Sequence, residues 1–414
     1  MLLINLILSA HMYNLNSQDD RRRMSQALRV ALIAGPMYER LYEALRHFSD
    51  LHAIEIDISF RGEHPALNAH LASFDDPPYD LISTHTKYAP SQAHFLAPLQ
   101  SCIEASEFSD FYPRSIELAT VDGDLLGIPR NIDVRLLHYR TDLIDTPPQT
   151  WDELFLTAKQ LTRDGFYGFV FPGRESGLFG TFFELAESAD AHLFPADHIP
   201  DIVNDGGRWA LNFIHELYAN GIVPAQIIDW HYDETHRCFR EGHAAMVGDW
   251  PAYYKAHLDP AYSKVHDKFG VAAYPAGPSG ISKTYGGCHT FALTRHGAKN
   301  AAAVDLLRFM TAQEQQMMEA VRGSVPVRRS VMQEVLSHAS KSEMQRWLIL
   351  EDVIQNSVLI PPKMRCYPEI EAVLWHTVQN AMGGKIDVEN ALRSIVSQIT
   401  DIIKTNAHLG ERYI

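Results

Sequence analysis

An α/β protein with two lobes is the fold class that the sequence predicts, and three observations point to it. The chain has 414 residues, which is more than one hydrophobic core usually organises. Short apolar runs alternate with segments of helical periodicity, as in mainly parallel sheets covered by helices. Segments rich in Pro and Gly lie between blocks of this alternation, which is typical of a chain that passes between lobes.

The first block of alternation begins near Leu28. Strands are predicted at residues 28–34, 54–60 and 79–84, and a helix at residues 37–48. In such sheets ligands bind beyond the carboxyl ends of the strands. Residues 35–38 and 85–88 are therefore expected at a binding site.

The second block begins after Pro147-Pro148. Helices are predicted at residues 150–161, 177–188, 210–217, 300–310 and 388–403, and strands at residues 167–171 and 244–247. Two sequences match the capping box, in which a Ser or Thr and a Glu three residues later satisfy the first free N–H groups of a helix. These are Thr150 with Glu153, and Thr311 with Glu314.

Composition and charge exclude several classes of protein. Hydrophobic residues make up 46% and charged residues 21% of the chain, which is ordinary for a globular protein and excludes disorder, collagen and coiled coil. The 51 acidic and 36 basic residues give a net charge of -15, and this sign disfavours nucleic acid and anionic membranes as partners. No apolar stretch approaches the roughly 20 residues of a membrane helix.

The N-terminal segment is only weakly similar to a secretory signal. Residues 2–8 are apolar apart from Asn5, and Ser9-Ala10 follows. A signal peptide normally begins with positive charge, but here the nearest arginines come later, at residues 21–23. Translation from Met24 would leave no export signal, so both export and retention in the cytoplasm remain open.

Sequence motifs of enzymes and metal sites are absent. The chain contains no GxxxxGK[ST], GxGxxG, GxSxG, HExxH or EF-hand pattern, and the four cysteines are too widely spaced for a zinc motif. His231 and His236 flank Asp233, but their spacing does not fit ligation from one helix face, so a solvated helix start is predicted there. We expect no catalytic residue, no cofactor and no metal.

Several short segments, taken in order, resemble a known family. They are 79–84 with 96–99, 126–133 running into 137–140, 148–154, 239–250, 285–287, 302–310, 323–327 and 381–392. In this order they resemble extracellular solute-binding protein family 1, the maltose-binding-protein-like group that serves carbohydrate ABC importers. The resemblance covers residues 28–404.

The resemblance implies a type II periplasmic-binding-protein-like fold. Two α/β lobes would be joined by a three-segment hinge, with the ligand cleft between them. We expect an N-terminal extension at 1–27, a first lobe of 28–130 plus 289–325, and a second lobe of 131–288 plus 326–414. The crossings are expected near 128–134, 285–291 and 323–330, where Pro and Gly segments suit a hinge.

The resemblance also places ligand-binding side chains on loops after strands and at the hinge. Carried over by position, the candidates are Tyr38, Glu39, His85, Lys87, Tyr88, Arg130, Asn131, Asp133, Phe171, Arg174, Glu175, Asp249, Trp250, Tyr253, Tyr285, Gly286, Gly287, His289 and Arg328. A sugar has apolar ring faces and a rim of hydroxyls, so aromatic plates with charged or amide groups suit it.

Several of these candidates have an alternative structural role. Trp250 is expected to stack on a pyranose or else to pack in the core. Asp249 would accept hydroxyl hydrogen bonds or cap a turn. Arg130 and Asp133 would contact ligand or pair with each other, and Glu39 could be an ordinary first-turn residue.

The expected function is capture of a mono- or oligosaccharide for an ABC importer, without catalysis. The basic candidates Lys87, Arg130, Arg174 and Arg328 leave an acidic sugar open as the ligand, since Arg binds such groups through two hydrogen bonds. We expect a periplasmic monomer that meets membrane permease subunits. The alternatives are a cytoplasmic sugar sensor of the same fold and a carbohydrate-active hydrolase, which would need two carboxyl groups facing each other.

Overall fold

The computed structural model describes residues 27–35, 38–196 and 199–408. The signal-like segment, the alternative start at Met24 and almost all of the expected N-terminal extension lie outside these residues. None of the described helices combines the length and the apolar character that crossing a membrane requires.

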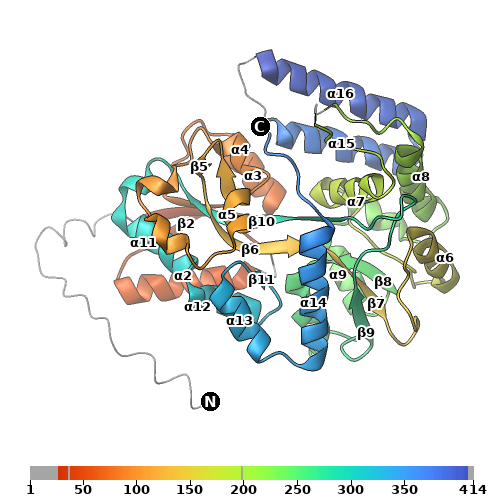
Figure 1. The fold of residues 1–414 in the computed structure, drawn as a ribbon, viewed down its shortest axis with the longest axis horizontal. Helices are drawn as coiled ribbons and strands as arrows, with labels where there is room; N and C mark the ends of the chain where they lie inside the picture. Colours follow the sequence, from red (N-terminus) through yellow and green to blue (C-terminus); the bar gives the residue numbers. More distant parts are fainter. Residues whose placement is uncertain (1–26, 36–37, 197–198, 409–414) are drawn as a thin grey trace, which may run out of the picture.

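A mixed sheet forms the centre of the first lobe (Figure 1). Its strands are β1 (Leu28–Ile33), β2 (Ile56–Gly62), β3 (Leu81–His85), β6 (Ile128–Val134), β10 (Thr284–Leu293), β11 (Val325–Pro326) and β12 (Val358–Leu359). They run in the order β11-β6-β10-β3-β1-β2, with β12 paired to β10. β1 is parallel to β2 and β3, whereas β10 is antiparallel to β3 and β6.

Helices cover this sheet and complete the first lobe. They are α2 (Glu39–His52), α3 (His64–Ala72), α4 (Ala89–Gln92), α5 (Pro113–Ala119), α11 (Ala301–Met310), α12 (Gln313–Ala320), α13 (Arg329–Ser337) and α14 (Lys341–Asn356), beside a small hairpin of β4 (Thr120–Val121) and β5 (Asp124–Leu125). α11 packs on α2 and β10, and α5 on β6 and β10. The apolar periodicity of α2 buries Leu41, Leu45 and Phe48 against this sheet's core.

The second lobe has a smaller sheet and a group of packed helices. Its strands are β7 (Leu136–Arg140), β8 (Met246–Asp249) and β9 (Phe269–Ala272), and its helices are α6 (Trp151–Leu161), α7 (Glu175–Glu187), α8 (Asp205–Ala219), α9 (Tyr232–Arg240), α10 (Tyr254–Leu258), α15 (Tyr367–Met382) and α16 (Val388–His408). The sheet is antiparallel in the order β8-β7-β9. α7, α8, α15 and α16 pack on one another at the upper right of Figure 1.

Two separate hydrophobic cores confirm the two-lobed α/β fold. Val134 at the end of β6 belongs to the first core, and Leu137 in β7 belongs to the second. In β10, Tyr285 packs in the second core and Cys288 in the first. At both places the chain passes from one core to the other.

The third crossing lies elsewhere than expected. Val325 and Val327 stay in the first core, because β11 pairs with β6. Trp347 of α14 packs there too, so α13 and α14 extend the first lobe beyond the boundary expected at residue 325. The chain instead passes over at β12, after which Met364 is the first residue fully buried in the second core.

Local signals predicted several element ends correctly and failed at two. The Thr150 hydroxyl accepts the N–H of Glu153 and starts α6 as a capping box. The box predicted at Thr311 does not form, since its hydroxyl donates to the carbonyl of Leu307 within the preceding helix. The strand predicted at 167–171 makes only isolated parallel bridges toward β8.

Candidate functional site

A cavity of about 100 Å³ lies between the two lobes. Its walls come from the ends of β1 and β3, the crossing in β10, and the starts of α7 and α9. They comprise Ile33, Ala34, Gly35, Tyr38, Glu63, His64, His85, Lys87, Asp133, Arg174, Ser176, His231, Tyr232, Asp233, Glu234, Trp250, Tyr253, Tyr285, Gly286, Gly287 and His289. The carboxyl ends of strands thus meet at this site, as the topology of such sheets requires.

Aromatic rings form much of the second-lobe wall. Trp250 follows β8 and remains partly exposed. Its ring lies 5.3 Å from the ring of Tyr232 and 6.0 Å from that of Tyr285, measured between centroids. On the first-lobe side, the ring of Tyr38 meets His289 edge-on at 5.7 Å. Flat apolar faces and polar ring substituents therefore share one enclosed space.

Three histidines meet on the first-lobe wall. The ring centroids of His64, His85 and His289 lie 4.9 to 5.5 Å apart. Burial lowers the pKa of His64 to about 3 and holds the pKa of the other two well below the ordinary value. At neutral pH these rings are uncharged, so each offers one N–H donor and one acceptor nitrogen.

Asp133 lies at the bottom of this wall, on the first crossing. Its Oδ2 accepts from Asn131 Nδ2 at 2.8 Å and lies 3.3 Å from His289 Nε2. Burial raises its pKa to about 6, although Arg130 acts in the opposite direction. Its Oδ1 is buried and has no partner, and the same holds for Nε2 of His64. Both atoms belong to residues that line the cavity, and neither has a hydrogen-bond partner within the protein.

Lys87 links the lobes beside the cavity. Its ammonium donates to Glu371 at 2.6 Å and to the hydroxyl of Tyr285 at 2.9 Å. Glu371 lies on α15 in the second lobe and also accepts from the hydroxyls of Tyr88 and Tyr367. This buried network fixes one closed arrangement of the lobes, since a buried ion needs its partners in place.

Eleven of the residues predicted from sequence line the cavity. They are Tyr38, His85, Lys87, Asp133, Arg174, Trp250, Tyr253, Tyr285, Gly286, Gly287 and His289. Whether they touch a ligand stays a prediction. The other eight do not line this cavity, and each has a different role.

Three of these eight face away from the cavity or lie in a core. Glu39 is on the surface, where it pairs with Arg61. Phe171 is buried in the second core. Arg328 donates to the backbone carbonyl of Thr311 and lies over the ring of Phe111.

Four others support the walls from behind. Tyr88 reaches into the second core, and Asn131 orients Asp133. Glu175 pairs with Arg174 at the start of α7. Asp249 is 2% exposed beneath Trp250, so it cannot accept ligand hydroxyls in this arrangement.

Arg130 pairs with Glu319 at 2.8 Å and covers the ring of Tyr38 with its guanidinium, 5.2 Å from the ring centroid. It therefore supports Tyr38 from outside the cavity lining, and its ion-pair partner is Glu319 rather than Asp133.

Sequence reasoning missed seven polar or charged lining residues. They are Glu63, His64, Ser176, His231, Tyr232, Asp233 and Glu234. The helix start predicted at His231 is correct, since its side chain and that of Glu234 form a capping box. The solvated environment was wrong, because His231 is 9% and His236 is 7% exposed. The sequence signal correctly predicted that a helix starts at His231. Only the folded structure shows that this helix start faces a cavity.

Comparison with known proteins extends the argument to most of the chain. Residues 61–345 match the family model described as bacterial extracellular solute-binding protein. A probable ABC transporter-binding protein of Deinococcus radiodurans is 30% identical over 243 residues, which cover 55% of this chain and 57% of that protein. The match thus spans little more than half the length of that relative.

Solved structures share the fold over nearly the whole chain. The maltose-bound MalE3 protein of T. maritima has a TM-score of 0.82 at 24% identity and covers 91% of this chain and 100% of its own. A solute-binding protein of an ABC transporter from Agrobacterium radiobacter K84, in complex with ribitol, has a TM-score of 0.80 at 19% identity, covering 91% and 99%. With the family match, these findings confirm the type II periplasmic-binding-protein-like architecture, and the chain belongs to the bacterial extracellular solute-binding protein family.

Proposed function

We propose that this protein is the substrate-binding component of an ABC importer and captures a small neutral sugar or polyol by closure of its lobes. The observation that carries the proposal is the enclosed cavity between the lobes. It combines aromatic faces with buried polar atoms that lack a partner. Membership of a solute-binding family indicates the type of protein, and the chemistry of the cavity indicates which class of solute it binds.

The cavity walls suit the two kinds of surface that a polyhydroxylated ligand presents. Trp250 and Tyr285 offer ring faces for the apolar C–H side of a sugar ring or a polyol chain. Oδ1 of Asp133 is an acceptor without a donor, and Nε2 of His64 also has no partner. Ligand hydroxyls can act as donor and acceptor to both, which removes the cost of leaving these atoms unpaired.

Size and charge narrow the ligand class further. The cavity of about 100 Å³ is well below the roughly 300–1,000 Å³ of drug-sized ligand pockets, which favours a monosaccharide or polyol over an oligosaccharide. Its lining includes the four carboxyl groups of Glu63, Asp133, Asp233 and Glu234, against the two cations of Lys87 and Arg174. Because an anionic ligand would meet this excess of carboxylates, we favour a neutral solute over an acidic sugar.

The remaining parts of the proposal follow from the type of protein. We propose export to the periplasm, a monomeric state, delivery of the ligand to membrane permease subunits, and no chemical turnover. Relatives carry ligands of this kind: one structural neighbour is described as maltose bound and another is in complex with ribitol. A cytoplasmic sensor would bind the same ligands, so the mature N-terminus in the native host separates the two.

A thermal-shift screen of the full chain tests the proposal. The panel holds neutral hexoses, pentitols and maltose beside the matching sugar acids, because a ligand that binds only the native state raises the melting temperature. We expect a neutral monosaccharide or polyol to give the largest rise, with calorimetry then giving one site per chain. If only sugar acids raise it, the charge argument is wrong. Conversion of a ligand to products during incubation, seen by chromatography, would instead indicate a hydrolase.

A further inference from the structure

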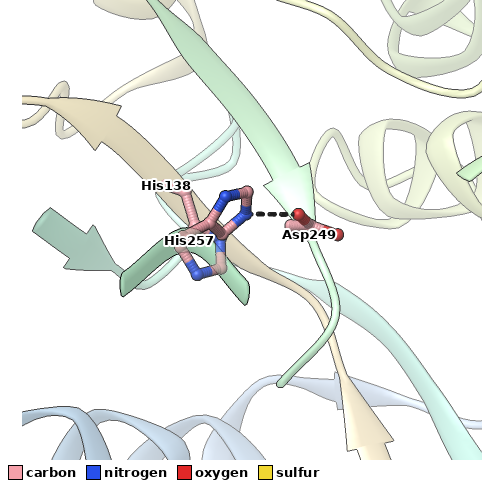
Figure 2. Close-up of side chains that lie close together, drawn as sticks. All are labelled: His138, Asp249 and His257. Carbon is pink, nitrogen blue, oxygen red and sulfur yellow. Dashed lines mark hydrogen bonds and ion pairs between the residues drawn. The ribbon is translucent and has the colours of Figure 1, made fainter. Parts of the chain in front are cut away.

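A second cluster of polar side chains lies beneath the cavity wall, away from the lining itself. His138 comes from β7, Asp249 from the end of β8 and His257 from α10, and Figure 2 shows the three side chains converging. They are 1%, 2% and 0% exposed. His138 is more than one hundred residues from the other two in sequence, so its meeting with them is a product of the tertiary fold.

The nitrogens of this cluster lack the partners that burial requires. Neither ring nitrogen of His138 has a hydrogen-bond partner, and Nδ1 of His257 has none. The ring of His138 is surrounded by other rings, with Phe269 at 5.9 Å and Phe239 at 6.5 Å between centroids. An apolar side chain would suit this position better, because nearly all buried polar atoms in proteins are satisfied. The two unpaired nitrogens of a fully buried imidazole therefore point to a missing ligand.

The distances within the cluster suit one metal ion. His257 Nε2 lies 2.7 Å from Asp249 Oδ2 (dashed in Figure 2), and one donor atom from each of the three residues lies within 4.8 Å of the others. Zinc bonds of about 2.0–2.2 Å place the ligand atoms of a tetrahedron roughly 3.3–3.5 Å apart. Bound zinc would therefore require Asp249 Oδ2 and His257 Nε2 to separate slightly and the most distant donor atoms to approach one another.

We propose that His138, Asp249 and His257 bind one divalent transition-metal ion of the zinc class. Two imidazoles and one carboxylate are donors that this class prefers, whereas magnesium and calcium prefer oxygen alone. His236 contacts the same carboxylate oxygen, Asp249 Oδ2, at 3.1 Å. It either orients Asp249 or completes a fourth position of the closed, buried site.

The bound ion would have a structural effect on the ligand cavity. Asp249 Oδ1 accepts the N–H of Trp250 at 2.9 Å, and His236 stacks on Tyr253 with centroids 3.9 Å apart. Trp250 and Tyr253 both line the cavity. An ion held by Asp249 would therefore fix the position of this wall before the ligand arrives.

The test uses the full chain without a polyhistidine tag, stripped of metal and then dialysed against zinc. We expect about one zinc per chain by elemental analysis and a rise in melting temperature with zinc that magnesium does not produce. Cobalt should bind in place of zinc and give the visible absorption of a tetrahedral site. The variant His138→Phe fills the same space without unpaired nitrogens, so it should fold but lose the stoichiometric ion and the zinc-dependent rise.

A matched control is His296→Ala, because this histidine is 65% exposed and distant in sequence from the cluster; it should keep the ion. Equal zinc binding by wild type and a folded His138→Phe protein would place the ion elsewhere and overturn the proposal. Absence of zinc binding by the wild type, together with higher stability of His138→Phe, would show a buried histidine network without metal. Should His138→Phe fail to fold, His257→Gln gives the same comparison from the other side of the carboxylate.

Discussion

Trp250 contributes to the cavity wall and only partly to the core, so its replacement by alanine should affect ligand binding more than folding. The ring contacts of Trp250 in the folded protein are Tyr232 at 5.3 Å and Tyr285 at 6.0 Å, with the guanidinium of Arg135 at 5.7 Å. Each such contact contributes about 0.5–1 kcal/mol. We therefore expect Trp250→Ala to lower the free energy of unfolding by about 1–3 kcal/mol.

The effect on affinity should be larger, because the indole would be a rigid aromatic plate against the ligand. Truncation of such an anchor costs about 2 kcal/mol or more, and about 1.4 kcal/mol corresponds to a tenfold change in affinity. The dissociation constant for the best ligand of the thermal-shift screen should rise at least tenfold. Trp250→Phe keeps a ring on the wall and should lose less.

Trp151 is the matched core residue for this comparison. It is 2% exposed and its ring meets those of Phe169, Phe213 and Tyr274, so Trp151→Ala should cost about 3–5 kcal/mol of stability. The assays are calorimetric titration with ligand and urea denaturation without it. Intact affinity in Trp250→Ala, combined with a stability loss as large as that of Trp151→Ala, would refute the assignment of Trp250 to the ligand site.

Three further predictions concern the residues around the cavity. Burial raises the pKa of Asp133 to about 6, so its carboxylate charge lowers the stability of the folded protein above that pH. Asp133→Asn should therefore raise the urea midpoint at pH 8 and leave it unchanged at pH 4. Equal effects at the two pH values would contradict this prediction. Lys87→Met leaves Glu371 buried without its cation and should lower the free energy of unfolding by about 3–5 kcal/mol. Adding Glu371→Gln should recover much of this loss. If the double variant is less stable than Lys87→Met alone, the pairing argument fails. A Cβ at Gly286 would lie 2.7 Å from the carbonyl oxygen of Asp133, so Gly286→Ala should lower the free energy of unfolding by about 1–3 kcal/mol through overpacking. At Gly383 the nearest atom to an added Cβ is 3.5 Å away, so Gly383→Ala should lower it much less in the same denaturation assay.

Much of the first lobe and some of the second were predictable, because the signals there are local. The apolar run at Leu28 is buried along almost its whole length as β1, and burial of one helix face repeats along α2. The capping box at Thr150 depends only on two side chains within one turn. His85 at the end of β3 was also within reach, since parallel topology fixes which strand end faces the ligand. Trp250 follows a strand of the antiparallel sheet, and its place came from the family resemblance.

The parts that could not be predicted depend on which core a segment joins. Residues 323–327 carry Gly and Pro as a hinge does, yet β11 pairs with β6 and keeps them in the first lobe. The third crossing at β12 has no Gly and begins directly after a helix. Likewise His231 reads as an ordinary helix start, yet it is buried in the folded protein. Pro and Gly indicate where an element breaks, but not where the chain then goes.

The basic residues show the same limit of sequence-based prediction, and they also bear on whether the ligand is charged. The four cations that left an acidic sugar open are Lys87, Arg130, Arg174 and Arg328. In the folded protein they pair with Glu371, Glu319, Glu175 and Asp110, respectively. A buried cation already satisfied by a carboxylate has little reason to attract a second anion, and removing its partner is costly. A sequence shows how many cations lie near a site, whereas the structure shows which of them are neutralised. Since the cavity lining has more carboxylates than cations, hydroxyl groups fit it better than another negative charge.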